Sequence, residues 1–185
     1  MNIARLAIPE VFLVEGVVHR DARGAFSETY RASALAEAGA GGPFVQENLA
    51  RTAAAGVLRG LHFQREPDGQ DKLIQVLAGS IYDVAVDIRP GSQTLGRWVA
   101  ATLSADAPRQ LFVPRGFAHG YLTLTADCAV LYKTSAYYAP QAEAGVRWDD
   151  PALAIAWPAP ASEISVNPRD AAWPPFAEVL ARLAL

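Results

Sequence analysis

The sequence predicts a mainly β protein, a sandwich or jelly-roll barrel with only short helices. Thirteen prolines and fourteen glycines among 185 residues interrupt the chain too often for long helices. Short apolar runs recur between turn residues, a spacing that is typical of sandwiches and barrels. We expect strands over residues 97–103, 111–113, 119–124 and 128–135.

A β-hairpin is predicted in the middle of the chain. Residues 72–77 and 80–88 are rich in β-branched side chains and flank Ala78 and Gly79. In the second run, alternation places Asp83 and Asp87 on one face, together with apolar side chains. Both faces are otherwise apolar, so we expect a barrel whose interior is partly polar.

Two helices are expected. Residues 31–38 contain good helix formers and end at Gly39, a natural C-terminal cap. After Pro175, the apolar side chains follow one helical stripe, so a C-terminal helix should pack on the main body or on a partner. The stripe consists of Phe176, Val179, Leu180 and Leu183. We find no internal repeat and no linker, and expect one domain over residues 1–185.

Composition and charge narrow the class of protein. Apolar residues make up 51% and charged residues 19%, which excludes intrinsic disorder. The net charge of −3 disfavours nucleic-acid and anionic-membrane partners. No apolar run approaches membrane-spanning length, and the N-terminus lacks a signal-peptide apolar block, so a cytoplasmic location is expected. The one cysteine, Cys128, lies in an apolar stretch and should be a buried thiol.

Several chemistries have no motif in this chain. The sequence has no G-x-x-x-x-G-K-[ST] phosphate loop, no G-x-G-x-x-G turn and no G-x-S-x-G nucleophile elbow. Two of the three histidines do lie in informative segments. His62 lies in residues 56–64 (GVLRGLHFQ) and His119 in residues 114–120 (PRGFAHG).

These two segments resemble the two halves of the cupin signature, in which histidines on facing strands of a small jelly roll bind a metal. Gln64 stands where the metal-binding version has a second histidine, and an amide is a poor transition-metal ligand. We therefore expect no metal, which leaves His62 and His119 for acid–base or anion-binding work. A metal-dependent cupin dioxygenase is the alternative.

Five motifs in order resemble the dTDP-4-dehydrorhamnose 3,5-epimerase family, over about residues 17–175. The resemblance implies a metal-free cupin fold and a homodimer. It also implies a dTDP-4-keto-6-deoxyhexose substrate whose carbons C3 and C5 are inverted, with no cofactor. The motifs are LRGLHFQ (58–64), DVAVDIR (83–89), GFAHG (116–120), YKT (132–134) and RWDDP (147–151).

Epimerisation beside a ketone needs a base, a group that stabilises the enolate, and an acid on the opposite face. The predicted base is His62, since imidazole titrates near neutral pH; the resemblance implies that Asp170 orients it. Tyr132 is the candidate acid and Lys72 the candidate enolate stabiliser. Each has an ordinary alternative: His62 a core histidine, Asp170 a turn or helix-cap residue, Tyr132 a core tyrosine, and Lys72 a solvent-facing lysine.

The substrate-binding residues follow from the same resemblance. Arginine forks suit a diphosphate, and in the family the segment around Arg23 reaches into the other subunit's site. Ala50 and Asn167 depart from the family pattern and leave fine specificity open. The predicted set is Arg23, Arg59 and His119 for phosphate, Gln46 and Asn48 for the nucleotide, Phe26 and Tyr138 for the thymine ring, and Glu28 and Glu143 for further contacts.

Two further functions stay open at this point. A relative that epimerises one carbon, or that isomerises the ketone, would use the same base and acid. A non-catalytic sugar-nucleotide binding module would keep the pocket and leave the acid–base groups idle.

Overall fold

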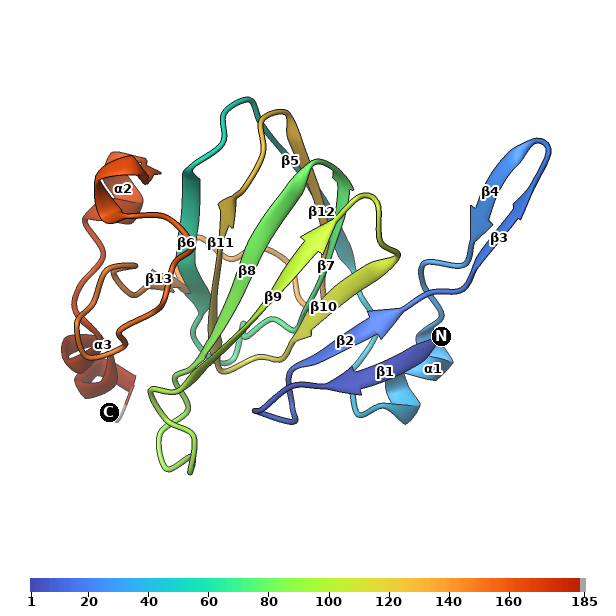
Figure 1. Cartoon of the computed structure of the whole chain (residues 1–185). Coiled ribbons are helices and arrows are strands. Elements are labelled where there is room, and N and C mark those ends of the chain that lie inside the picture. Colours follow the sequence, from blue (N-terminus) through green and yellow to red (C-terminus); the bar gives the residue numbers. More distant parts are fainter. Residues whose placement is uncertain (184–185) are drawn as a thin grey trace.

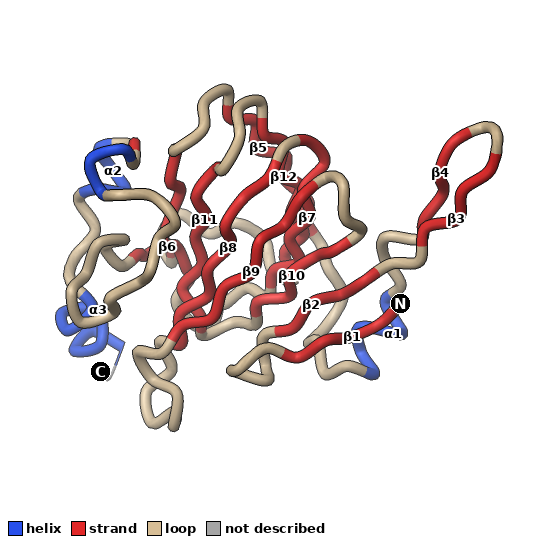
Figure 2. The backbone as a smooth tube through the Cα atoms, in the orientation of Figure 1, coloured by secondary structure: helices blue, strands red, loops and turns tan. Residues whose placement is uncertain are grey.

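The computed structural model describes residues 1–183 and consists mainly of antiparallel strands. Two sheets face each other as a barrel, and a separate two-stranded hairpin projects from it (Figure 1). The predicted mainly β, jelly-roll architecture is confirmed. Figure 2 shows that the helices lie only at the two flanks of the barrel.

The first sheet has six strands. In spatial order they are β1 (Asn2–Arg5), β2 (Phe12–Glu15), β10 (Arg109–Val113), β7 (Lys72–Ala78), β12 (Cys128–Thr134) and β5 (Gln46–Thr52). The second sheet runs β13 (Glu143–Gly145), β6 (Val57–Gln64), β11 (Phe117–Thr123), β8 (Ser80–Asp87) and β9 (Trp98–Ser104), and β14 (Ser165–Val166) pairs with β6. The projecting hairpin is β3 (Val18–Asp21) and β4 (Gly24–Ser27).

The predicted hairpin over residues 72–88 is wrong. β7 pairs with β10 and β12 in the first sheet, whereas β8 pairs with β11 and β9 in the second. Between them Gly79 (φ +73°) turns the chain from one sheet to the other, and a Cβ there would lie 2.5 Å from Thr125 Oγ1. The glycine that indicates a hairpin in the sequence thus forms a tightly packed corner of the barrel.

Two predicted helices are confirmed. The structure has α1 (Ala32–Glu37) and α3 (Phe176–Leu183), together with the short α2 (Pro168–Ala171) and the 3-10 turn η1 (Ala161–Glu163). Phe176 and Val179 of α3 are buried in an apolar cluster that includes the outer face of the second sheet. No helix among residues 1–183 has both the length and the hydropathy needed to cross a membrane.

The main core lies between the two sheets. It combines side chains such as Ile74 and Val76 of β7 with Ile81 and Ala85 of β8. Cys128 belongs to this core as a buried free thiol, as predicted. A polar patch interrupts the core on the same face of β8, where Asp83 is fully buried. The expected partly polar barrel interior is therefore present.

Candidate active site

A bulge in the second sheet brings two site residues to the same face. His119 pairs directly with His62, but the next aligned pair is Tyr121 with Arg59. The three-residue step on β6 thus matches a two-residue step on β11, so Arg59 and His62 both face the barrel interior. Gly60 occupies the bulge with φ +134°.

His62 and Asp170 form a hydrogen-bonded pair. The His62 Nε2 atom lies 2.7 Å from Asp170 Oδ1, and the other carboxylate oxygen accepts the Gly60 N–H at 3.1 Å. Burial raises the pKa of Asp170, but the bond and charge of His62 and the Gly60 N–H outweigh it and lower that pKa overall. The charged carboxylate holds the Nε2–H tautomer, which leaves Nδ1 as the free basic nitrogen.

A helix cap formed by Asn167 positions Asp170. Asn167 accepts the Asp170 N–H at 2.8 Å with its side-chain oxygen and so begins α2. Asparagine and serine are comparable N-cap residues, so the departure at Asn167 keeps this function. The side chain of Asp170 is nearly fully buried. Asp170 therefore lies in the first turn of α2 with its N–H bound by the Asn167 cap, and its carboxylate bonds directly to His62.

A second histidine–carboxylate pair lies beside the first. The His119 Nε2 atom lies 2.6 Å from Asp83 Oδ1, and both residues are buried. Asp83 Oδ2 has no hydrogen-bond partner among residues 1–183. This pair places a buried negative charge opposite the ammonium group of Lys72, whose pKa the charge of Asp83 raises.

Lys72 is buried rather than solvent-facing. It begins β7 and donates a hydrogen bond from Nζ to the His62 carbonyl oxygen at 3.3 Å. Burial lowers the pKa of Lys72 to about 8, against the charges of Asp83 and Glu143, which raise it. Lys72 is thus a cation that stays charged at neutral pH beside the backbone of the predicted base.

Tyr132 approaches from the opposite sheet. It lies on β12, directly across the ladder from Asn48 of β5, and packs against the core between the sheets. Burial raises the pKa of the Tyr132 phenol, and the charge of Arg59 on the facing sheet lowers it in part. His62 and Tyr132 therefore come from opposite walls of the barrel.

A polar chain lines one side of this region. The Gln46 side chain accepts the Tyr138 N–H at 2.9 Å and donates to Asn48 Oδ1 at 3.0 Å. Tyr138 donates its hydroxyl to Glu143 Oε2 at 2.5 Å, and Arg169 forms an ion pair with the same carboxylate. Burial raises the pKa of Glu143, but these two partners lower it overall.

Arg169 and Trp173 are absent from the predicted set. Arg169 directly precedes Asp170 in the sequence, and this position next to a predicted site residue is the signal that could have identified it. The Trp173 ring lies edge-on to the His62 ring, with centroids 6.1 Å apart. No periodicity in the sequence points to that contact.

Gln64 supports the binding region, and both polar atoms of its side chain are hydrogen-bonded. Its Oε1 accepts the Ala139 N–H at 2.8 Å, while its Nε2 donates to the carbonyls of Asp68 at 2.7 Å and Tyr137 at 3.2 Å. The side chain thus fixes the segment that carries Tyr138. Among residues 1–183, no group of three or more His, Cys, Asp or Glu side chains is arranged to hold a metal ion.

The structure does not bring Arg23, Phe26 or Glu28 to this site within one chain. Arg23 lies in the turn of the projecting hairpin, 90% exposed and paired with Asp21 (Figure 1). Phe26 is 71% exposed on β4, and Glu28 pairs with Arg31. That the segment acts in another subunit stays a prediction.

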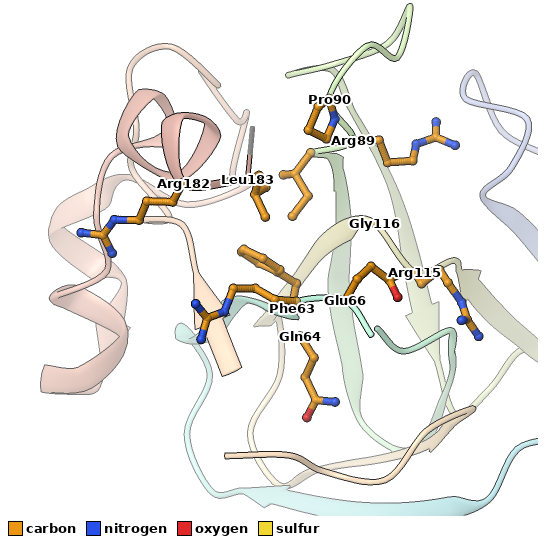
Figure 3. A pocket seen from close by; sticks show the side chains of 11 residues that line it. Phe63, Gln64, Glu66, Arg89, Pro90, Arg115, Gly116, Arg182 and Leu183 are labelled. Carbon is orange, nitrogen blue, oxygen red and sulfur yellow. The ribbon is translucent and has the colours of Figure 1, made fainter. Parts of the chain in front are cut away.

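A separate cavity lies on the other side of β6. Its volume is about 430 Å³, and its wall includes Phe63, Pro90 and Leu183, the last residue of α3 (Figure 3). Phe63 follows His62 directly and packs in the outer apolar cluster. Because neighbouring strand residues point to opposite faces, Phe63 points away from the site that contains His62, although Gln64 also lies along the cavity wall.

The chain is similar in sequence to proteins of one known family. A family model described as dTDP-4-dehydrorhamnose 3,5-epimerase matches residues 5–178. The Escherichia coli protein of that name is 45% identical over 172 residues, 92% of this chain and 91% of that protein.

Two solved structures are also similar. The dTDP-6-deoxy-D-glucose-3,5-epimerase of Legionella pneumophila, in complex with dTDP-4-keto-L-rhamnose, has a TM-score of 0.92 and 42% identity, covering 98% of this chain and 96% of that one. A 3'-monoepimerase from Streptomyces bikiniensis with dTDP-quinovose has a TM-score of 0.87 and 35% identity, covering 98% and 91%.

Proposed function

The chain belongs to the dTDP-4-dehydrorhamnose 3,5-epimerase family, and from this premise we propose which of its residues carry out the reaction. The enzyme inverts C3 and C5 of dTDP-4-dehydro-6-deoxy-glucose to give dTDP-4-dehydro-L-rhamnose. In the proposal His62 is the base, Tyr132 the acid, Asp170 the partner of the base, and Lys72 the stabiliser of the enolate. The supporting observation is the His62–Asp170 pair on one sheet, opposite Tyr132 on the other.

Each inversion is a proton exchange beside the ketone. Nδ1 of His62 takes the proton from the carbon, and the electrons of the broken C–H bond form the enolate, with the charge on the C4 oxygen. The Lys72 ammonium donates a hydrogen bond to that oxygen. Tyr132 then gives its proton to the same carbon from the opposite face, which reverses its configuration. A proton released by His62 to solvent and one returned to Tyr132 from solvent restore the starting state.

The charges of the site suit this sequence. The Asp170 carboxylate stabilises the imidazolium that forms on His62, as the acid of a catalytic triad does. Burial keeps Tyr132 protonated, because it raises the pKa of the phenol. An enolate held by a preorganised cation in a site shielded from water is stabilised more than it would be in solution.

Substrate binding is proposed for residues around this centre. Arg59 and His119 lie on neighbouring strands of the second sheet, and we assign the diphosphate to them because charged nitrogen donors form strong hydrogen bonds to phosphate. The hydrogen-bonded residues Gln46, Tyr138 and Glu143 offer polar and aromatic contacts to the nucleotide. Asn48 joins this group through Gln46.

A homodimer is part of the proposal. Arg23, Phe26 and Glu28 would contact substrate in the site of a second copy, and the exposed Phe26 on a projecting hairpin supports this arrangement. We also propose a cytoplasmic location. The one cysteine is a buried free thiol, a state common in that reducing compartment.

Deuterium exchange tests the reaction directly. The enzyme is incubated with dTDP-4-keto-6-deoxyglucose in deuterated water, and NMR counts the exchanged positions. Deuterium at both C3 and C5 is the expected result. Deuterium at C3 alone would replace the double epimerase with a mono-epimerase, a reading that similarity to the Streptomyces bikiniensis 3'-monoepimerase favours as the second candidate. No exchange at either carbon would reject both.

A further inference from the structure

Trp173 forms a wall beside the proposed base. It lies between α2 and α3, and its ring meets the His62 ring edge-on at an interplanar angle of 72°. The His62 ring is held at Cβ by its covalent bond and at Nε2 by the hydrogen bond, but its plane can still rotate about the line between these two atoms. A flat neighbour against the ring restricts the pivot.

Gly145 provides the space for this contact. It pairs with His62 in the β13–β6 ladder, so it points to the same face of the sheet. A Cβ on Gly145 would lie 2.5 Å from both Cδ2 and Cε2 of Trp173. The indole therefore occupies the position that a side chain at residue 145 would take, next to His62.

The indole also lies beside Asp170 and Arg169. Its Nε1 is buried and has no hydrogen-bond partner among residues 1–183. The Trp173 side chain nevertheless lies near enough to Asp170 to help lower the pKa of that carboxyl. On the ring face, the Arg169 guanidinium lies 5.5 Å from the centroid, and Arg169 is paired with Glu143.

We propose that Trp173 is a positioning residue that fixes the plane of the His62 ring, so that Nδ1 faces the substrate while Nε2 stays on Asp170. The inference rests on the proposed role of His62 as base. Reacting groups must be held within a fraction of an ångström of productive geometry, and a misplacement of about 1 Å can cost about 100-fold in rate. Loss of the ring should therefore lower kcat, with little effect on substrate binding.

The test compares Trp173→Ala, Trp173→Leu and Trp173→Phe in the full-length enzyme. Alanine and leucine should lower kcat about 10-fold or more with KM changed less than about 3-fold. Phenylalanine keeps a ring edge and should restore most of kcat. Trp157→Ala is the matched control, because Trp157 packs on Tyr82 and bonds to the Trp148 carbonyl. It should leave kcat unchanged.

A second background isolates the mechanism. In a His62→Ala enzyme, adding Trp173→Leu should cause no further loss of residual activity, because residues that act as a unit are non-additive. Wild-type kcat in both Trp173→Ala and Trp173→Leu would overturn the inference. So would a further loss in the His62→Ala background, or a loss that appears in KM alone. Thermal unfolding identifies a variant that fails to fold. If Trp173→Ala is unfolded, the kcat of Trp173→Leu, in which leucine refills the space, tests the proposal. A fully active His62→Ala enzyme would instead overturn the proposed base.

Discussion

His62 and His119 are direct partners in the β6–β11 ladder, and each binds a different carboxylate through Nε2, His62 that of Asp170 and His119 that of Asp83. The two pairs differ in access. The side chain of His62 is 32% exposed and that of His119 is 10% exposed. One ladder thus carries two similar pairs with different openings to solvent, and in the proposed function His62 transfers the proton whereas His119 binds substrate.

This division predicts different kinetic effects for the two histidines. His62→Asn should lower kcat about 100-fold or more, as expected for the loss of a general base, and leave the Kd for dTDP within about 3-fold of wild type. His119→Asn should weaken dTDP binding more than it lowers kcat. Steady-state kinetics and calorimetric titration with dTDP measure both. The opposite pattern, with kcat lost at position 119 and binding lost at position 62, would contradict the assignment.

The state of Lys72 predicts the alkaline side of the pH profile. Burial lowers the pKa of Lys72 to about 8, so the ammonium is present below that pH and is lost as pH rises through it. The enolate loses its cation, and kcat/KM should therefore fall above about pH 8. Tyr132 does not cause this fall, because burial raises the pKa of its phenol above the ordinary tyrosine value.

The variant Lys72→Met distinguishes the titration of Lys72 from that of Tyr132. This variant should lose about 100-fold or more in kcat, the usual cost of removing one such electrostatic contact, and its residual activity should lack the fall near pH 8. The profile is measured from pH 6 to pH 10 with the wild type in parallel. An unchanged alkaline limb in Lys72→Met would assign that titration to another group.

Much of the fold follows from the sequence, because turn residues and β-branched runs act locally. The strands near residues 97–103 and 128–135 form as predicted. The predicted hairpin around Gly79 is wrong because a glycine turn has the same sequence pattern in a hairpin and in a corner between two sheets. The distinction depends on contacts with Thr125 and Cys128, which are distant in the sequence.

The site is less accessible to local reasoning. His62 and Asp170 are separated by 108 positions, and only the family resemblance pairs them. Alternation along a strand would place Arg59 and His62 on opposite faces, and only the bulge at Gly60 corrects this. The contact of Trp173 with His62 depends on the absence of a side chain at Gly145, and no pattern in the sequence predicts this contact.

Gly60 should be essential to the bulge. A Cβ there would lie 2.5 Å from the Gly120 Cα and 2.9 Å from the His119 carbonyl oxygen, and the φ of +134° is strained for other residues. Both obstacles are backbone atoms and cannot rotate away. Gly60→Ala should therefore destabilise the fold by about 3 kcal/mol or more, and should also reduce activity in the folded fraction.

Gly91→Ala is the matched control for Gly60→Ala. Gly91 also has a positive φ, +80°, but a Cβ there would meet no atom within 4 Å. It should cost only the backbone strain of about 1–2 kcal/mol. Chemical denaturation measures both variants. Equal losses in the two would show that the close approach of β6 and β11 at Gly60 contributes nothing beyond φ.

The projecting hairpin predicts complementation between subunits. In an Arg23→Ala/Phe26→Ala chain, the His62 site is intact but the hairpin is defective; in a His62→Ala chain the reverse holds. If the hairpin completes the partner's site, a mixed dimer contains one complete site. Co-expression at equal levels should then restore about a quarter of wild-type activity, because half of the dimers are mixed and each has one working site of two.

Each variant alone should be nearly inactive. A mixture no more active than its components would show that the hairpin does not act across the dimer, and full activity of the hairpin variant alone would remove Arg23 and Phe26 from the site.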